Sequence, residues 1–507
     1  MFPANSVLRI PFDPITLSYV MALRGVRPRL PKEDFTYGEL GCGTGERIVL
    51  LAACNPEGVF FGFDSDIEKL NKAAEKAEEV GIKNVTFSKA SATELKEAVD
   101  AKIISGKSFD YLVYNDAGNA QSETPAVICD VTKCLLRDNG VLAYRYATYN
   151  EANADELLFK SLTRHILAEQ PDKGEALAQE WRGLSHAYLS NHPALAQAFD
   201  KALSEGKGFE WLRNASNGDT KTSKTLEVSQ LFSGRELTYL GSANLSANYM
   251  ELSAPDACHK ALEAKRLHPL YESLKDLATG TNERIDLWGR EPLVRTDNLV
   301  SLFSEFTFGV TEPAEQVVRT VTFQGKSISF AGPLYDSVIS LASVMPTTMG
   351  DLVHHETLSQ VDAITILNTV QLLVACGILT PMRSSFEGGI DMSNPKLVGT
   401  YNQSLRKIRP DIQEYAFASV VAGRPVFFSG LNTLVLQNLD KGGVDGIAGF
   451  MCDDLLRLAQ HPHLQPLNLN STTRAAEEAY NQIEISFQQY MVRWFSLGLI
   501  NTHSKSA

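Results

Sequence analysis

Between residues 36 and 64, the pattern of apolar and polar positions predicts a strand, a glycine-rich turn, a helix and a second strand. A short extended run leads into the turn 41–45, and a helical segment with four consecutive apolar residues, 48–51, follows it. The sequence at 55–58 breaks this helix, and the apolar run 59–63 ends on Asp64. Strand, turn, helix and strand in this order indicate an α/β fold with a parallel sheet.

The chemistry of this unit predicts a site for a nucleoside-containing cofactor. Glycines allow a tight turn and let a ligand approach the main chain, and the following helix presents unpaired N–H groups to it. Asp64, at the end of the second strand, can accept hydrogen bonds from both hydroxyls of a ribose. The glycines are spaced G-x-G-x-G after Glu39, whereas the dinucleotide fingerprint is G-x-G-x-x-G.

This motif resembles the first motif of the class I S-adenosylmethionine methyltransferases, E/D-x-G-x-G-x-G. The resemblance implies that the cofactor is S-adenosylmethionine, that Glu39 faces its methionine end and that Asp64 binds its ribose. Ser91 stands where that family commonly has an acid that contacts the adenine amino group, so a hydroxyl or the main chain is expected there. The loop residues expected to bind the cofactor are Gly41, Cys42, Gly43, Thr44 and Gly45.

Two segments are predicted to face the methyl acceptor. Asn115 and Asp116 follow the predicted strand 109–114, and ligands of open α/β sheets bind at the carboxyl ends of strands. These two side chains could orient an amine or hydroxyl, or they could simply close the strand in an Asx turn. Asn115 is also expected to contact the cofactor.

A predicted fifth strand, 141–146, is followed by Tyr149, which forms an aromatic group with Tyr144 and Tyr146. Aromatic rings beside a methyl donor can hold an amine. Tyrosines that alternate along a strand more often pack in the core.

The rest of the chain resembles one particular group of these methyltransferases. Residues 151–223 read as a helical insert, and 237–243 as a returning strand. The stretch from 226 to 295 looks like the methyltransferase regulatory-domain family, whose best-known members are rickettsial protein-lysine methyltransferases that modify an outer-membrane surface protein. Two segments depart from that family: 115–119 replaces an aromatic-rich loop, and its Tyr-Asn step is displaced to 149–150.

The C-terminal third contains a repeated pattern of two apolar-faced helices, a glycine and a short strand, which predicts two winged-helix-like modules. The predicted fold class is therefore α/β, with a Rossmann-like methyltransferase sheet, a helical insert and mainly helical modules after it. The predicted domains are 1–250 for cofactor binding, 251–330 as a middle or regulatory domain, and 331–400 and 401–507 as the two modules.

Composition limits the partners. The 507 residues are 44% hydrophobic and carry a formal net charge of -13, which disfavours a broad phosphate-binding face and suits a cationic partner. The seven cysteines form no C-x-x-C pair and the histidines no metal-binding pattern, so reduced thiols, no metal and a cytoplasmic protein are expected. We expect a lysine-bearing protein partner, no nucleic acid and no membrane insertion, with a homodimer left open.

These observations predict an S-adenosylmethionine-dependent methyltransferase that modifies a protein amine, with lysine of a surface or outer-membrane protein as the expected acceptor. Two alternatives remain. One is an O- or N-methyltransferase of a small molecule or glycan. The other is a protein that binds the cofactor without turnover and recognises partners through its C-terminal modules.

Overall fold

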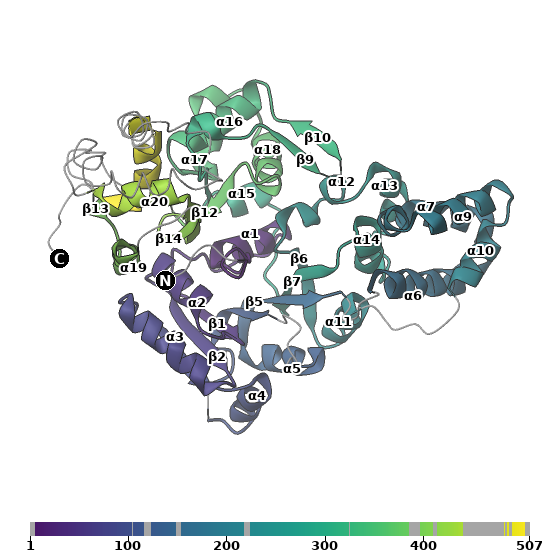
Figure 1. Cartoon of the computed structure of the whole chain (residues 1–507), viewed down its shortest axis with the longest axis horizontal. Coiled ribbons are helices and arrows are strands. Elements are labelled where there is room, and N and C mark those ends of the chain that lie inside the picture. Colours follow the sequence, from purple (N-terminus) through teal and green to yellow (C-terminus); the bar gives the residue numbers. More distant parts are fainter. Residues whose placement is uncertain are drawn as a thin grey trace, which may run out of the picture.

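A computed structural model describes residues 6–103, 105–115, 123–148, 154–216, 224–323, 325–384, 396–408, 413–439, 481, 484–485 and 489–501. Figure 1 shows a central sheet with helices on both faces and a helical arm on one side. The C-terminal half of the chain, which begins after Arg290, lies on the other side.

The central sheet has seven strands in the order β3-β2-β1-β4-β5-β7-β6. The strands are β1 (Thr36–Leu40), β2 (Val59–Asp64), β3 (Val85–Lys89), β4 (Phe109–Asn115), β5 (Leu136–Ala147), β6 (Leu237–Ser242) and β7 (Glu283–Arg290). The first five run parallel, whereas β7 is antiparallel to both β5 and β6. The predicted α/β class is confirmed. However, β7 lies beyond the predicted domain boundary at residue 250, so the sheet domain extends to Arg290.

Alternating side chains of the strands build two cores, one on each face of the sheet. Tyr111 and Val113 pack on the face covered by α1 (Pro14–Leu23) and α2 (Glu46–Cys54). Leu112 packs on the opposite face, against α4, α5 and α11. The bounds are Ala92–Asp100 for α4, Pro125–Leu135 for α5 and Lys224–Ser233 for α11, and α3 (Ile67–Glu79) contacts α2 and β3.

The arm consists of two excursions of the chain from the same end of the sheet. The first contains α6 (Ala154–Glu169), η1 (Pro171–Lys173), α7 (Glu175–Leu184), α8 (His186–Asn191), α9 (Pro193–Ser204) and α10 (Gly208–Ala215). The second lies between β6 and β7 and contains η2 (Leu245–Asn248), α12 (Met250–Ser253), α13 (Asp256–Glu263) and α14 (Tyr271–Thr279). One hydrophobic core joins both excursions, so the arm is larger than the predicted insert.

Both excursions end beside Thr148, the residue that follows β5 and from which the first excursion starts. The Thr148 N–H donates to the Asn282 carbonyl over 2.9 Å, and the Thr148 carbonyl accepts from the Lys224 N–H over 3.1 Å. Thr148 is buried. The start of the first excursion and the ends of both excursions are therefore joined by hydrogen bonds at Thr148.

The unit after the sheet domain surrounds a three-stranded sheet, β11-β8-β12. Its elements are α15 (Leu299–Phe303), β8 (Thr307–Gly309), η3 (Ala314–Gln316), β9 (Thr320–Phe323), β10 (Lys326–Ser329), α16 (Pro333–Val344), β11 (Thr347–Thr348), α17 (Met349–His354), η4 (Glu356–Leu358), α18 (Ala363–Ala375) and β12 (Thr380–Met382). Phe303, Phe306 and Phe308 share one core with α16 and α18. The predicted boundary between residues 330 and 331 therefore falls inside this unit, because those three rings need the later helices to be buried.

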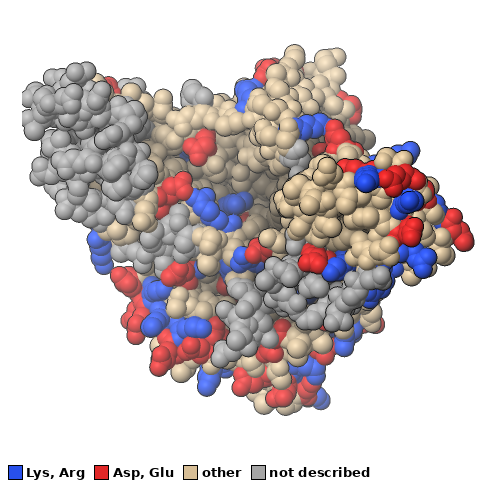
Figure 2. Space-filling view, turned by 45° about the vertical axis from the view of Figure 1, so that its right-hand side comes forward, with Lys and Arg blue, Asp and Glu red and all other residues tan. Residues whose placement is uncertain are grey.

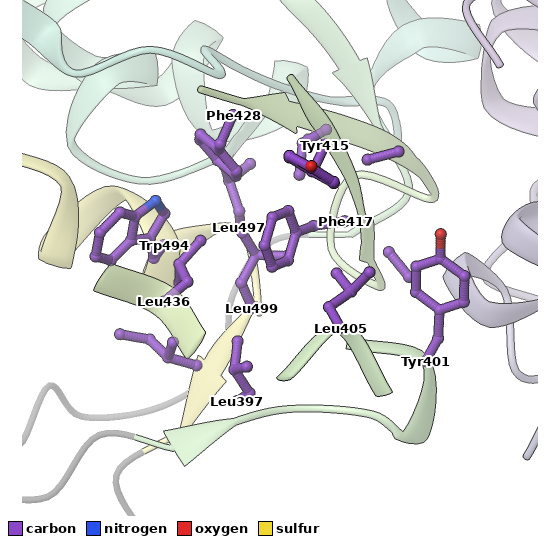
Figure 3. Packing of buried hydrophobic residues seen from close by; sticks show 14 of the residues in the cluster. Leu397, Tyr401, Leu405, Tyr415, Phe417, Phe428, Leu436, Trp494, Leu497 and Leu499 are labelled. Carbon is purple, nitrogen blue, oxygen red and sulfur yellow. The ribbon is translucent and has the colours of Figure 1, made fainter. Parts of the chain in front are cut away.

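The last unit contains β13 (Lys396–Leu397), α19 (Thr400–Ser404), η5 (Leu405–Lys407), β14 (Tyr415–Ser419), β15 (Arg424–Phe428), α20 (Gly430–Gln437), helical residues 489–496 and β16 (Ile500–Asn501). Figure 3 shows its core, in which Phe417, Phe428 and Trp494 lie together. The predicted second module spans residues outside the described part, and the winged-helix character of both modules stays a prediction.

Helix α2 belongs to two cores. Ile48 and Leu51 pack against the sheet, whereas Val49, Leu50 and Cys54 pack in the core of the last unit. The Asn55 amide, which follows the helix, donates to the Gly423 carbonyl over 3.0 Å. The last unit is thus docked directly onto the helix that follows the glycine turn.

None of the helices in the described ranges is long and apolar enough to cross a membrane.

We expect Leu50→Ala to destabilise the protein by about 2–5 kcal/mol, because it leaves a cavity between α2 and the last unit. Urea denaturation measures the change. Leu267→Ala is the matched control, since Leu267 is fully exposed, and should change stability by less than about 0.5 kcal/mol. Equal effects of the two substitutions would contradict the shared core.

Candidate active site

The glycine turn between β1 and α2 depends on left-handed backbone at three positions. Gly41, Gly43 and Gly45 have φ values of 72°, 56° and 73°. A Cβ on Gly45 would lie 2.6 Å from the Ala73 side chain, whereas a Cβ on Gly41 or Gly43 would meet nothing among the described residues within 4 Å. Gly45 is therefore needed for packing on α3, and the other two leave open space over the turn.

Asp64 fixes the turn from the end of β2. Its Oδ2 accepts a hydrogen bond from the Gly43 N–H at 2.9 Å, and its Oδ1 accepts from the Asp66 N–H at 2.9 Å. Each carboxylate oxygen can accept a second bond, so the group retains acceptor capacity for two hydroxyls. The predicted ribose acid and the predicted loop are thus in direct contact.

Glu39, on β1, lies below the turn and forms a buried ion pair with Arg47 of α2. The Arg47 Nη2 is 2.5 Å from Oε1, and its Nε is 3.4 Å from Oε2. Burial raises the pKa of Glu39, and the Arg47 guanidinium opposes that shift. The Phe12 ring covers the guanidinium, with the Arg47 Cζ 4.6 Å from the ring centroid.

The other predicted cofactor residues lie around this turn. The Cys42 N–H donates to the Phe63 carbonyl over 3.0 Å, and its side chain is buried in the sheet core. The Thr44 carbonyl accepts a bond from the Lys76 ammonium at 3.4 Å. Ser91 caps α4 in a capping box with Glu94: its Oγ accepts the Glu94 N–H at 3.2 Å, while its own N–H donates to the Glu94 carboxylate at 2.7 Å. Its hydroxyl proton can still be donated to a ligand.

On the acceptor side, the structure describes Asn115, whereas Asp116 and Tyr149 lie outside the described residues. Asn115 Oδ1 accepts a bond from Arg145 Nη1 at 3.1 Å, and Arg145 forms a two-pronged pair with Glu283 at 2.8 and 2.6 Å. The ends of β4, β5 and β7 are therefore linked by one chain of polar contacts.

Tyr144 and Tyr146 pack in the core of the sheet and do not face a ligand site. Both are fully buried, their ring centroids are 4.9 Å apart, and Tyr144 stacks on Phe232. The Tyr146 hydroxyl donates to the Asp286 carboxylate at 2.6 Å. These rings support the sheet rather than line a binding surface.

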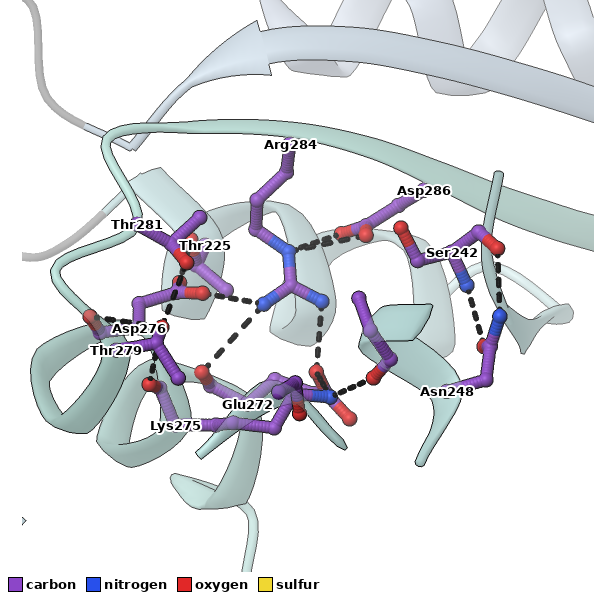
Figure 4. Close-up of polar contacts among 12 residues, drawn as sticks. Thr225, Ser242, Asn248, Glu272, Lys275, Asp276, Thr279, Thr281, Arg284 and Asp286 are labelled. Atoms are coloured by element: carbon purple, nitrogen blue, oxygen red, sulfur yellow. Dashed lines mark hydrogen bonds and ion pairs between the residues drawn. The ribbon is translucent and has the colours of Figure 1, made fainter. Parts of the chain in front are cut away.

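A buried ionic cluster lies where β7 meets α14 (Figure 4). Arg284 contacts three carboxylates, at 2.7 Å for Glu272, 2.6 Å for Asp276 and 3.0 Å for Asp286. Its Nη2 also donates to the Tyr239 hydroxyl over 3.0 Å. The cluster ties the arm to the sheet.

The cluster contains more carboxylates than cations, and this excess of negative charge affects the pKa values of the three acids. Burial raises the pKa of Asp276 to about 6, with Arg284 opposing and the neighbouring carboxylates adding to the shift. Burial also raises the pKa of Asp286. For Glu272, the cations Lys275 and Arg284 outweigh burial and lower the pKa to about 2.

A pocket of about 250 Å³ lies beside this ionic cluster, at the end of the sheet from which the arm extends. Residues that line it include Ser242, Asp276, Glu283, Arg284 and Phe323. Figure 2 shows a wider recess between the arm and the C-terminal half, and charges of both signs are interspersed over the arm on the visible face.

Strand register places the predicted cofactor residues along one edge of the sheet. Leu40 pairs with Phe63 of β2 and with Tyr114 of β4, so the turn lies between Asp64 and Asn115. Ser91 follows β3, the next strand beyond β2. From β3 to β4 this edge covers three strand spacings, or about 14 Å. Among the described residues, no group of three or more His, Cys, Asp or Glu side chains could hold a metal ion.

Comparison with known proteins identifies two segments of the chain. Residues 31–207 match the family model described as a methyltransferase domain. Residues 217–290 match the predicted methyltransferase regulatory domain. The second match covers β6, α14 and β7, so the regulatory segment supplies two strands of the central sheet.

The chain is also similar in sequence to two proteins of other organisms. An uncharacterized protein of Synechocystis sp. is 21% identical over 436 residues, which is 84% of each chain. A tRNA (guanine-N(7)-)-methyltransferase of Chloroflexus aggregans is 41% identical over 61 residues, which is 12% of this chain and 27% of that protein.

Among solved structures, PKMT2 from Rickettsia typhi has the same fold over nearly the whole chain. Its structure in complex with AdoHcy superposes with a TM-score of 0.63 at 15% identity, covering 97% of this chain and 98% of that one. A second PKMT2 structure gives a TM-score of 0.61 at 15% identity with the same coverage.

The cofactor is S-adenosylmethionine, and the residues at the turn fit it. Because Gly41 and Gly43 have no side chain, the space above them is open to a ligand, and a Cβ at either position would occupy part of that space. Asp64 has acceptor capacity for the ribose hydroxyls, and Glu39 and Arg47 place one negative and one positive group beside the turn. When bound, this cofactor supplies a methyl group on a positively charged sulfur.

Sequence reasoning missed three arginines. Arg47 could have been noticed, because a cation in the first turn of a helix opposes the helix dipole and therefore needs an acid nearby. Arg145 and Arg284 carried no such signal, since their partners come from other strands and helices.

We expect Gly43→Ala to weaken S-adenosylmethionine binding about tenfold or more, because the new methyl group would enter the open space over the turn. Isothermal titration calorimetry measures the affinity. Gly206→Ala is the matched control, since Gly206 has a φ of 70° with nothing within 4 Å and lies in the arm. Both variants carry similar backbone strain, so an equal loss of affinity would contradict the assignment.

We expect Arg284→Met to destabilise the protein by about 3–5 kcal/mol at pH 8, because it leaves the buried carboxylates of Asp276 and Asp286 without their cation. A carboxyl whose pKa is raised by folding contributes stability that is lost as pH rises through that pKa. The variant raises these pKa values further, so its defect should shrink at pH 5.

Thermal unfolding at the two pH values tests this. Arg295→Met removes an exposed pair with Glu291, 3.7 Å apart, and should cost less than about 1 kcal/mol at either pH. A defect of Arg284→Met that grows toward pH 5 would be contrary to the cluster described here.

Proposed function

We propose that this chain, which belongs to the class I S-adenosylmethionine-dependent methyltransferases with a methyltransferase regulatory domain, transfers the methyl group to a lysine amine of a protein. The partner is then a lysine-bearing protein rather than a nucleic acid. The similarity to a tRNA methyltransferase covers only 12% of this chain, so it gives little support for an RNA substrate.

The observation that supports this proposal most is the extent of the shared architecture. PKMT2 from Rickettsia typhi matches not only the sheet domain but also the arm and the C-terminal half, with 97% of this chain covered. The arm and the C-terminal half flank a recess on the surface (Figure 2). A recess of this kind suits a protein surface better than a small acceptor.

The polar chain at the ends of β4, β5 and β7 also suits an amine. A lysine amine must lose its proton before it attacks a methyl group, and its unperturbed pKa is about 10.4. Asn115 and Glu283, both bound to Arg145, place amide and carboxylate oxygens at this edge that can accept hydrogen bonds from such an amine.

One observation favours a different acceptor. The pocket of about 250 Å³ beside Arg284 opens at the same edge of the sheet. It is slightly smaller than the range of about 300–1,000 Å³ typical of small-molecule sites. A small acceptor that binds there is the second candidate, as an O- or N-methyltransferase of a small molecule or glycan.

Labelled S-adenosylmethionine distinguishes these functions. The purified protein is incubated with an extract of the source cells, which is separated into protein and low-molecular-weight fractions. We expect label in protein and methyllysines in its hydrolysate, and no label with Asp64→Ala. Label confined to the small-molecule fraction would favour the second candidate. Cofactor binding without transfer to either fraction would indicate a non-catalytic protein.

A further inference from the structure

The buried pair of Glu39 and Arg47 is costly in two respects. Both side chains are almost fully buried, with 2% and 5% of their surface exposed, and burying charges exacts a desolvation penalty. Arg47 is also the second residue of α2, where the helix dipole is positive and disfavours a cation. A pair in this position is therefore better explained by binding than by stability.

Arg47 has a donor that the protein does not use. Glu39 takes Nε and Nη2, and the buried Nη1 has no hydrogen-bond partner among the described residues. Phe12 stacks on the flat face of the guanidinium, which leaves the in-plane N–H groups of Nη1 unsatisfied. A buried unsatisfied N–H group at a functional site points to an absent acceptor, and a guanidinium selects a carboxylate.

The cofactor carries the matching groups at its amino-acid end, an ammonium and a carboxylate. We propose that Arg47 binds the carboxylate of S-adenosylmethionine through Nη1, while the Glu39 carboxylate that it holds faces the ammonium. The pair then forms one complementary surface for an α-amino acid. This inference concerns the cofactor, so it is independent of which acceptor receives the methyl group.

Access to Nη1 requires a small rearrangement. Phe12 must move from the guanidinium, or the guanidinium must turn in its plane. The contact from Nε to Glu39, at 3.4 Å, is long and therefore weak, whereas the contact from Nη2, at 2.5 Å, is short. A turn that gives up the first and keeps the second would bring Nη1 out without separating the ion pair.

Three ligands that differ only at the amino-acid end test the proposal. S-adenosylhomocysteine carries both the ammonium and the carboxylate, S-adenosyl-3-thiopropylamine lacks the carboxylate, and 5′-methylthioadenosine lacks both. Calorimetry of the full chain gives the affinity for each. Arg47→Met is the test variant, because methionine retains an apolar contact for Phe12 without a donor.

We expect Arg47→Met to weaken S-adenosylhomocysteine binding about 10- to 100-fold, the range for a lost hydrogen bond to a charged group. The loss for S-adenosyl-3-thiopropylamine, which keeps the ammonium, should be smaller than the loss for S-adenosylhomocysteine, and binding of 5′-methylthioadenosine should change by less than about twofold. Equal losses for all three ligands would mean that Arg47 only maintains the turn. No loss for any of them would equally overturn the proposal.

Arg47→Lys keeps a cation beside Glu39 and serves if the methionine variant does not fold. A lysine has no planar fork, so it cannot hold Glu39 and a ligand carboxylate in the same geometry. We expect a selective loss for S-adenosylhomocysteine here as well. An affinity profile identical to that of the wild type would contradict a role for the guanidinium fork. None of these measurements depends on methyl transfer.

Discussion

The burial of helix α2 on two sides is the constraint on which the rest of the structure depends. One side packs on the sheet through Ile48 and Leu51, and the other completes the core of the last unit through Val49, Leu50 and Cys54. The glycine turn is attached to the first residue of this helix. A shift of α2 that improves its packing on the sheet would therefore also change its packing in the last unit and the position of the glycine turn.

This arrangement explains how a distant part of the chain reaches the cofactor site. The last unit contains no residue of the turn, yet the Gly423 carbonyl accepts a bond directly after α2. Cores are densely packed, so a displacement of one partner is transmitted to its neighbours rather than absorbed. The last unit is therefore positioned to act on the turn through α2.

Arg284 of β7 and Arg47 of α2 are both buried, but their contacts serve different purposes. Arg284 donates to three carboxylates and a tyrosine hydroxyl, and each of its nitrogens has a partner. Arg47 serves one carboxylate and leaves Nη1 unpaired among the described residues. The first arrangement is complete without a ligand and holds the arm to the sheet, whereas the second becomes complete only when another anion arrives.

The sequence predicted the cofactor unit well because its signals are local. Glu39, the glycines and Asp64 lie within one strand-turn-helix-strand segment, and the structure places them around one turn. Contacts between distant segments carried no comparable signal. The place of β7 inside the sheet and the three acids around Arg284 depend on pairing between elements far apart in the chain. Tyr144 and Tyr146 look the same in sequence whether they pack or bind, and only burial distinguishes the two.

The meeting of three chain segments at Thr148 has a consequence for how this architecture can vary. The arm leaves the sheet and returns to it at hydrogen-bonded neighbours, so its ends stay fixed whatever lies between them. Insertions and deletions are best tolerated where the ends of a segment are close together. Lineages could therefore lengthen, shorten or replace the arm and so change which partners the enzyme reaches, while the cofactor site at the ends of β1, β2 and β4 is inherited intact.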